Sequence, residues 1–378
     1  MLVARLAQME NNERQRLMKR AAQLRKATRP PAVKTAALRR YLQDDEEPQA
    51  IRRRAPSLED YVWRLLTEEE ASASGEVGES ALRGTVVSIG PRVCEVMVDG
   101  KLTNCLLSPD LAARQQTELA VGDVATLERR GGETIVNGVL PRRTKLSRPD
   151  AGNLNLERVI VANVDVVVVV VSVISPPLHP RLIDRYLIAI QRGGATPIIA
   201  VNKLDLHASE AELQEDLARL APYQVLGVPV VLCSANTGRG REELLECLHG
   251  RVSAFVGHSG VGKSSLLNMV KPDLSLKTGE VSDGYGRGTH TTTRSTLWDL
   301  GSGTRVIDTP GIRSFGLWNL REDELPYFFP EFAVAGRCKF GDCTHTHEPG
   351  CCVKVAVQTG AIAEDRYDTY LRIKETLK

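Results

Sequence analysis

The feature that most constrains the fold is a glycine-rich loop between an apolar strand and a helix. The apolar run Val252–Val256 precedes this loop, and a helical pattern from Ser264 to Val270 follows it. The loop matches the pattern G-x-x-x-x-G-K-[ST], and its residues are Gly257, His258, Ser259, Gly260, Val261, Gly262, Lys263 and Ser264, with Ser265 next. In such a loop, backbone N–H groups at a helix N-terminus surround phosphates. The sequence therefore predicts a P-loop nucleotide site.

Lys263 and Ser264 carry the chemistry expected of this loop. The Lys263 ammonium is expected to reach the β- and γ-phosphates as a catalytic group, and the Ser264 hydroxyl to bind Mg²⁺. A P-loop by itself does not distinguish ATP from GTP, so a P-loop ATPase or kinase is an alternative at this point. The choice must come from the residues that meet the base.

The P-loop lies in a long region where apolar strands alternate with amphipathic helices. Strands are expected at 164–173, 197–201, 228–232, 252–256 and 304–307, and helices near 181–192, 210–220, 241–248 and 264–270. Such alternation predicts a doubly wound parallel α/β sheet. The most apolar run, Val166 to Val173, is far shorter than the roughly 20 residues that a membrane-spanning helix needs. It is typical of a strand buried on both faces.

Two loops that follow neighbouring strands indicate the base. The first is Asn202-Lys203-Leu204-Asp205. In GTPases an N-K-x-D sequence holds guanine, because the Asp carboxylate accepts hydrogen bonds from N1–H and the 2-amino group, and adenine would leave this acceptor unpaired. The second, Cys233-Ser234-Ala235-Asn236, resembles the loop whose backbone contacts guanine O6. Together the two loops favour GTP and argue against an ATPase or kinase.

Two further segments resemble the switches of GTPases. In Asp308-Thr-Pro-Gly311, Asp308 is expected to bind Mg²⁺ through water and the Gly311 N–H to sense the γ-phosphate. The glycine- and hydroxyl-rich loop from Gly284 to Thr293 suits a switch that supplies a threonine to Mg²⁺, with Thr292 preferred to Thr291. The guanine loops thus precede the P-loop and both switches, whereas ordinary GTPases have the guanine loops last. Joining the old termini and opening new ones allows the same sheet to form, so the sequence predicts a circularly permuted GTPase.

Four of the eight cysteines fall in one short C-terminal segment, together with two histidines. Three thiolates and one imidazole satisfy tetrahedral Zn²⁺ and leave no open position, as in a structural site. The expected ligands of one zinc ion are Cys338, Cys343, His345 and Cys351, and the rival candidates are His347 and Cys352. The ion would stabilise a small domain that lacks a large core. The other cysteines, Cys94, Cys105, Cys233 and Cys247, lie in apolar contexts that favour packing and a reducing compartment.

Residues 79–145 are expected to form a separate all-β domain. Short strands at 84–90, 93–98, 102–107, 121–127 and 133–139, with a hairpin turn at Asp99-Gly100, suggest an OB-fold barrel. Its basic residues Arg83, Arg92, Lys101, Arg129 and Arg130 could contact RNA, although surface charge of this kind is equally expected without a ligand. The segment from Pro141 to Leu154 is interpreted as a linker.

Residues 1–78 form a basic extension, with 14 Lys and Arg against 6 Asp and Glu through Arg54. A solvated or disordered tail is the plain interpretation. An arm that docks on RNA is an alternative, and an organellar transit peptide is a weaker one. The net charge of the whole chain is only +2, so RNA contacts would depend on local patches. Without a secretory signal or a membrane span, we expect a cytoplasmic protein.

Together these motifs resemble the RsgA (YjeQ) family of ribosome small-subunit-dependent GTPases. The resemblance covers residues 80–378 and includes G-R-G-x-H-T-T from Gly286 to Thr292, D-T-P-G, and C-x₄-C-x-H-x₅-C ending at Cys351. It implies an OB-fold, a permuted GTPase domain at 155–318 and a zinc-binding domain at 319–378. It also implies binding to the 30S subunit and its rRNA, a role in late subunit maturation, and GTP hydrolysis to GDP that the subunit stimulates. We expect a monomer that binds no membrane.

The resemblance also bears on catalysis. Ile312 follows Gly311, where many GTPases carry a glutamine that positions water. An apolar side chain cannot orient the attacking water, so another group must do so. The family implies the switch-one histidine, which is His290 here, although this residue could instead contact only phosphate or RNA. A non-catalytic RNA-binding scaffold with a regulatory nucleotide site is the second alternative function.

Overall fold

The structure is a computed structural model that describes residues 82–90, 92–150, 156–274, 276, 295–310 and 315–377, without the side chains of 113–117. The basic extension at 1–78 lies outside the described residues. Within them, no helix is long and apolar enough to cross a membrane.

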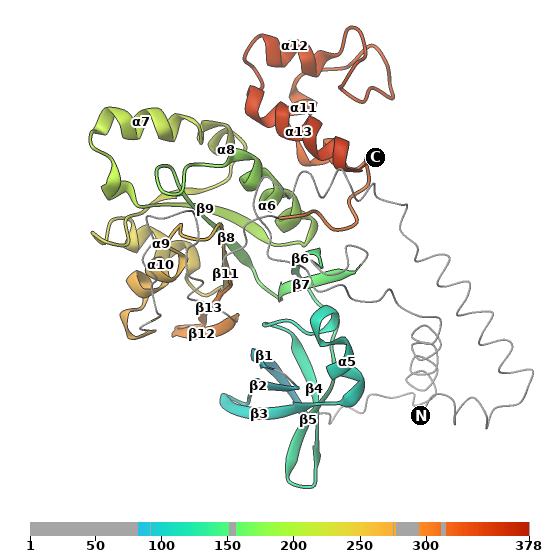
Figure 1. Cartoon of the computed structure of the whole chain (residues 1–378), viewed down its shortest axis with the longest axis vertical. Coiled ribbons are helices and arrows are strands. Elements are labelled where there is room, and N and C mark those ends of the chain that lie inside the picture. The colour runs from blue at the N-terminus through green and yellow to red at the C-terminus, as the bar shows by residue number, and fades with distance from the viewer. Residues whose placement is uncertain are drawn as a thin grey trace, which may run out of the picture. The chain divides into compact units, whose positions relative to one another are not determined.

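Five parallel strands form one end of the described sheet, and most of them are labelled in Figure 1. Their order is β10-β9-β8-β11-β13, with β12 antiparallel beside β13. The bounds are β8 Val166–Ser172, β9 Thr196–Asn202, β10 Val230–Leu232, β11 Val252–Val256, β12 Thr296–Gly301 and β13 Thr304–Asp308. The parallel sheet is confirmed, whereas β12 was not predicted.

Helices cover both faces of this sheet, as a doubly wound fold requires. They are α6 Pro180–Arg192, α7 Glu210–Ala218, α8 Ala221–Val225, α9 Arg241–Leu248 and α10 Lys263–Val270, with short turns η1 Leu204–Leu206 and η2 Pro272–Leu274. Alternate valines of β8 enter different cores: Val167 and Val169 pack with α6, whereas Val166, Val168 and Val170 pack with α9 and α10. Both faces of β8 are therefore buried, which explains its uninterrupted apolar sequence.

The N-terminal strands close into a small barrel. Its elements are β1 Leu82–Gly90, β2 Val93–Val98, β3 Lys101–Leu107, α5 Pro109–Glu118, β4 Val124–Arg130 and β5 Glu133–Val139. The strand order β1-β2-β3-β5-β4 closes through pairing of β4 with β1, and this is the predicted OB-fold. Cys94 and Cys105 are 2% exposed and belong to its core, which agrees with their predicted packing role.

The barrel and the α/β sheet are joined by hydrogen-bonded structure, and residues 145–149 of the segment interpreted as a linker form a strand. Ser88 of β1 pairs with Thr296 of β12, which makes the two sheets continuous. Arg142 forms an ion pair with the buried Asp123 at 2.7 Å. Strand β6 (Lys145–Pro149) pairs with β7 (Glu157–Ala162). Prolines and charged residues concealed this short strand in the sequence.

The C-terminal region is built around aromatic side chains. Its elements are η3 Leu325–Phe328, α11 Glu331–Val334, α12 Cys352–Gln358 and α13 Glu364–Leu377. Phe329, Phe332 and Tyr370 form a buried cluster that also includes Ile188 of α6. The region thus shares a core with the α/β sheet, although the chain as a whole is poor in aromatics.

A buried ion pair also attaches α13 to α6. The Arg366 guanidinium lies between Asp184 of α6, at 2.6 Å, and Glu331 of α11, at 2.7 Å. It also stacks over the Phe329 ring. Because Asp184 is fully buried, removing Arg366 would leave an uncompensated charge.

Candidate functional site: a nucleotide site and a cysteine cluster

The guanine-recognition loops meet at the carboxyl ends of β9 and β10. One Asp205 oxygen accepts a hydrogen bond from Ser234 Oγ at 2.5 Å, and the other accepts one from Asn236 Nδ2 at 3.2 Å. The Ser234 hydrogen bond is the main reason that the pKa of Asp205 lies below its usual value. Asp205 is therefore an oriented, ionised acceptor, which is the group that N1–H and the 2-amino group of guanine require.

Asn202 joins the guanine loops to the P-loop. Its side-chain amide donates to the Val261 carbonyl at 2.9 Å and accepts from the Ala235 N–H at 3.0 Å. A Cβ on Gly262 would lie 2.3 Å from Asn202 Nδ2, so only glycine allows the two loops to approach this closely. The described structure thus brings together three loops that the sequence separates by as much as 60 residues.

The P-loop connects β11 to α10 in the predicted manner. Gly257 has a φ of +149°, and a Cβ there would lie 2.3 Å from the Val170 carbonyl. The Lys263 ammonium is buried and donates to the carbonyls of Gly257 and His258 at 3.0 and 3.1 Å. Burial lowers the pKa of Lys263 to about 8, opposed by the charge of Asp308. An ammonium with three N–H bonds keeps one for a phosphate oxygen.

Two of the residues expected to hold Mg²⁺, Ser264 and Asp308, are adjacent. The Ser264 hydroxyl lies 3.4 Å from Asp308 Oδ2 at the end of β13. A hydroxyl and a carboxylate beside a phosphate-binding loop are oxygen ligands suited to Mg²⁺, which keeps several waters and binds few protein groups. Thr309 fixes this strand end by donating to the Phe255 carbonyl at 2.6 Å. The donor set therefore fits the ion.

The structure places most other predicted nucleotide residues in these same loops: Lys203, Ala235, His258, Ser259, Gly260, Val261 and Ser265. Lys203 has a φ of +67° and donates from Nζ to the Ser175 carbonyl at 2.7 Å. Its pKa is lowered by burial. His290, Thr292, Gly311 and Ile312 lie outside the described residues.

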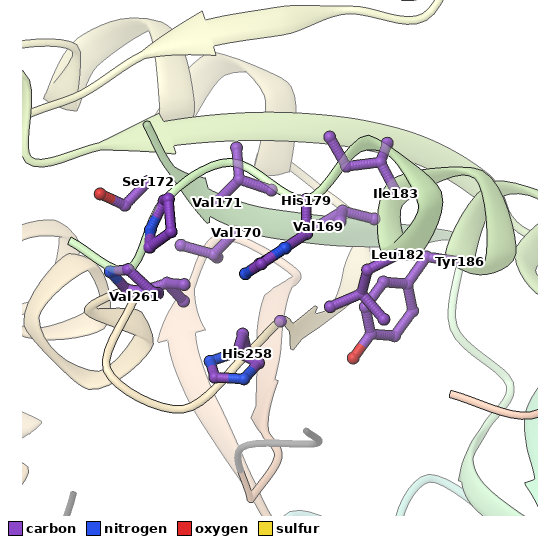
Figure 2. Close-up of a pocket in the computed structure, with 13 residues that line it drawn as sticks. Val169, Val170, Val171, Ser172, His179, Leu182, Ile183, Tyr186, His258 and Val261 are labelled. Carbon is purple, nitrogen blue, oxygen red and sulfur yellow. The ribbon is translucent and has the colours of Figure 1, made fainter. Parts of the chain in front are cut away.

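A small pocket lies between β8, α6 and the P-loop (Figure 2). The imidazoles of His179 and His258 face it with their centroids 6.1 Å apart, and Tyr186 lines it. The Tyr186 ring packs on Phe315, which follows the D-T-P-G segment, with centroids 4.6 Å apart. Arg185, which precedes Tyr186 in α6, donates from its guanidinium to the Phe315 carbonyl at 3.1 Å. Helix α6 therefore holds the chain where it leaves the second predicted switch.

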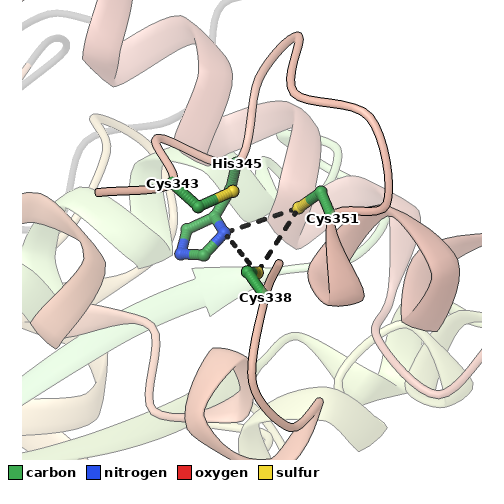
Figure 3. A group of neighbouring side chains, drawn as sticks. All are labelled: Cys338, Cys343, His345 and Cys351. Carbon is green, nitrogen blue, oxygen red and sulfur yellow. Dashed lines mark hydrogen bonds between the residues drawn. The ribbon is translucent and has the colours of Figure 1, made fainter. Parts of the chain in front are cut away.

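The four predicted zinc ligands come together in the C-terminal region (Figure 3). Their ligand atoms all lie within 4.8 Å of one another. His345 Nδ1 lies 3.6 Å from Cys338 Sγ and 3.5 Å from Cys351 Sγ, and the two sulfurs are 4.0 Å apart. A zinc tetrahedron has S···N edges of about 3.6 Å and S···S edges of about 3.8 Å, given its bond lengths. The geometry is that of a Cys₃His metal site.

Surrounding side chains hold the loop that carries these residues. Tyr367 and Tyr370 donate to the carbonyls of His345 and Thr344 at 2.7 and 2.8 Å. Glu348 accepts from the Thr344 N–H and the Thr346 N–H at 2.8 and 3.0 Å, and these bonds keep the pKa of its carboxyl low despite partial desolvation. The loop therefore has a defined shape.

Of the two rival ligands, neither belongs to the group of four. His347 Nδ1 contacts the Thr346 hydroxyl at 3.0 Å instead. Cys352 Sγ lies 2.9 Å from Cys338 Sγ and 3.2 Å from the Gly336 carbonyl.

Sequence reasoning missed several residues that support these sites. Asn236 belongs to the predicted tetrapeptide, but nothing in the sequence indicates its contact with Asp205. Glu348 lies inside the cysteine segment, where a carboxylate between two threonines was the available signal. Arg185 and Tyr186 carried no motif, because their partners are more than 60 residues away.

Known proteins resemble this chain over most of its length. Residues 139–318 match the family model described as RsgA GTPase. A relative named small ribosomal subunit biogenesis GTPase RsgA, from Chlorobaculum tepidum, is 40% identical over 74% of this chain and 92% of its own length. One with the same name from Haemophilus influenzae is 41% identical over 74% of this chain and 80% of its own.

Two solved structures are also similar. YjeQ from Thermotoga maritima has a TM-score of 0.61 and 34% identity, covering 78% of this chain and 98% of that protein. YloQ, described as a circularly permuted GTPase, has a TM-score of 0.58 and 27% identity, covering 80% and 96%. The permuted order of the sites on the sheet agrees with that description. The chain therefore belongs to the RsgA family, and it is a circularly permuted GTPase.

Proposed function

We propose that this GTPase binds the 30S ribosomal subunit, assists its late maturation, and leaves when subunit-stimulated hydrolysis converts GTP to GDP. The observation that supports the proposal most strongly is a complete guanine site joined to a P-loop, in a chain whose relatives are named for small ribosomal subunit biogenesis. The protein would act as a monomer in the cytoplasm.

Three domains would have separate roles in this function: a barrel at 79–145, a GTPase domain at 155–318 and a zinc-binding domain at 319–378. The five basic residues of the barrel named above are all exposed, as contact with rRNA phosphates requires. Zinc would be held by Cys338, Cys343, His345 and Cys351, and would stabilise its loop rather than react. The extension at 1–78 could add further RNA contacts.

Hydrolysis would depend on phosphate positioning and charge stabilisation. The remaining N–H of Lys263 would donate to the β- and γ-phosphates, and the P-loop amides would surround them. Ser264, Thr292 and Asp308 would hold Mg²⁺, the last through water. The ion, when bound, neutralises charge on the phosphate oxygens. The Gly311 N–H would sense the γ-phosphate, and His290 would position the attacking water.

Co-sedimentation with purified 30S subunits tests the ribosomal part of this proposal. We expect the protein to pellet with 30S subunits in the presence of a non-hydrolysable GTP analogue and to remain in the supernatant with GDP. The control is the 50S subunit, with which the protein should not pellet. Equal pelleting with either nucleotide would contradict release on hydrolysis.

Phosphate release tests the catalytic part. Hydrolysis of GTP should be slow alone and faster with 30S subunits, and ATP should not replace GTP. Absence of stimulation would contradict the ribosomal role and favour a scaffold with a regulatory nucleotide site. A His290→Ala variant that kept full stimulated turnover would remove this histidine from the mechanism, and His249→Ala, at an exposed histidine beyond α9, would serve as the control.

A further inference from the structure

A fourth sulfur lies directly beside the three sulfurs of the metal cluster. Cys352 is the first residue of α12 and follows the ligand Cys351. Its Sγ is 2.9 Å from Cys338 Sγ, which is closer than the about 3.8 Å expected between two sulfurs on one zinc ion. A disulfide would require a separation of about 2.05 Å. Less than 1 Å of movement therefore separates this contact from a covalent bond.

Cys352 also differs in its surroundings from the cysteines buried in the apolar cores. Cys94, Cys105 and Cys233 are at most 2% exposed in apolar cores, where a dissolved oxidant cannot reach them. Cys352 is partly exposed, as is Cys338. Within the described residues, Cys338 and Cys352 thus combine sulfur contact with solvent access, and one of the two is a metal ligand.

We propose that Cys338 and Cys352 form an oxidation-sensitive thiol pair whose disulfide displaces the metal. This inference presupposes the zinc ion proposed above but not the ribosomal role. The oxidant class is a peroxide, which reacts with the exposed thiol. Cys352–SH and H₂O₂ give Cys352–SOH and H₂O. The Cys338 thiolate then attacks Cys352 Sγ, the S–O bond breaks, and hydroxide leaves.

The second step explains the loss of metal. The electron pair with which Cys338 held zinc now forms the S–S bond, so Cys343, His345 and Cys351 remain as three ligands. A tetrahedral structural site that loses a thiolate binds its ion less tightly. A dithiol reductant returns both thiols by exchange and restores the fourth ligand.

Zinc release under hydrogen peroxide, followed with a chromogenic chelator, tests the pair on the full chain. The metal content of untreated protein is measured first, which examines the zinc proposal separately. We expect the wild type to release its zinc on oxidation, and Cys352→Ser to release it roughly tenfold more slowly because the thiol that peroxide oxidises first is absent. Cys247→Ser, which removes a partly exposed thiol of α9, should behave as the wild type.

Peptide mapping by mass spectrometry gives a second readout that does not depend on the metal. Oxidised wild type should contain a Cys338–Cys352 cross-link that a dithiol removes. A cross-link from Cys338 to Cys343 or Cys351 instead, or equal rates of zinc release in wild type and Cys352→Ser, would overturn the proposal. It would also be overturned if untreated Cys352→Ser lacked zinc that the wild type holds, because Cys352 would then be a ligand.

Discussion

The two regions of the predicted nucleotide site, the guanine end around Asp205 and the phosphate end around Lys263, differ in how the protein stabilises the charge of the key side chain. At the guanine end, the charge of Asp205 is already compensated in the free protein by hydrogen bonds from Ser234 and Asn236. At the phosphate end, burial disfavours the charge of Lys263, and the groups that oppose this effect within the described residues are two backbone carbonyls and the nearby Asp308. The predicted guanine end therefore holds Asp205 in a fixed geometry that would suit selection of the base. The phosphate end contains a cation whose charge the nucleotide itself would stabilise.

The largest expected effect concerns the phosphate end. Replacing Lys263 with alanine removes the cation that the phosphates would stabilise, and we expect single-turnover GTP hydrolysis to fall by about 10²- to 10³-fold, the cost of losing one transition-state donor. Lys271→Ala is the control, because the partly exposed Lys271 lies at the far end of α10 and donates from Nζ to the Asp299 carbonyl at 2.7 Å. Equal rates in the two variants would mean that Lys263 does not act on the phosphates.

The next effect concerns the guanine end. Asp205→Asn replaces an ionised acceptor by an amide, so GTP affinity should fall by about 10- to 100-fold, because hydrogen bonds to charged groups contribute roughly 1.5–3 kcal/mol. Xanthosine triphosphate, which offers an acceptor in place of the 2-amino donor, should bind better to the variant than to the wild type. Titration with fluorescent nucleotides measures both, and Glu215→Gln on α7 is the exposed control. Unchanged base preference would contradict the assignment of Asp205.

The pH dependence of GTP binding in alkaline solution should report on Lys263 at the phosphate end and not on Asp205 at the guanine end. The pKa of Lys263 is lowered to about 8 in the free protein, and bound phosphates would raise it. Affinity should therefore be level below about pH 8 and fall by up to about tenfold per pH unit above it, because binding then requires uptake of a proton. The pH profile of Lys263→Ala should lack this fall.

The same shift has the opposite consequence for stability without nucleotide. Between about pH 8 and 10.5 the unfolded chain retains a proton that folded Lys263 has lost. Since the unfolded state then binds more protons, the free energy of unfolding gains a contribution that rises with pH in this window. Urea denaturation at several pH values, with Lys263→Ala as the comparison, would reveal it. A contribution that fell with pH would mean that the Lys263 pKa is not depressed.

The smallest expected effect follows from removing the hydrogen bond that orients Asp205 and lowers its pKa. Ser234→Ala removes the 2.5 Å hydrogen bond and should weaken GTP binding severalfold, since one such bond contributes about 1 kcal/mol. The pKa of Asp205 should rise, so affinity would be lost at a higher pH than in the wild type as the solution is acidified. Thr237→Ala is a close control, because its backbone N–H, not its side chain, contacts Ser234.

Local patterns were sufficient to predict much of this molecule. Strands β2, β5 and β11 and helix α9 have the predicted bounds, because apolar periodicity and flanking turns define them within a few residues. The P-loop, the guanine loops and the cysteine cluster are sequence-local motifs with a strict chemical requirement. Their residues could therefore be named in advance.

Features that depend on distant partners could not be predicted in this way. Strand β12 is half exposed and becomes a strand only through β13 and β1. The strand Lys145–Pro149 is short and rich in charged residues, and it becomes a strand only through its pairing with β7. Asp184 and Arg366 are 182 residues apart, and nothing local marks them as partners. Non-local pairing and buried charge thus account for most of what the sequence did not reveal.

The permuted strand order also sets an order of synthesis. A nascent chain emerges N-terminus first, so β8, β9 and β10 are all available before any residue of the P-loop has been made. Strand β8 gains its second neighbour only when β11 arrives. During that interval, the most apolar strand of the chain has an unpaired edge, and such an edge is a template for pairing with other chains. Translation through residues 230–256 is therefore the period in which this protein most needs protection from misassociation.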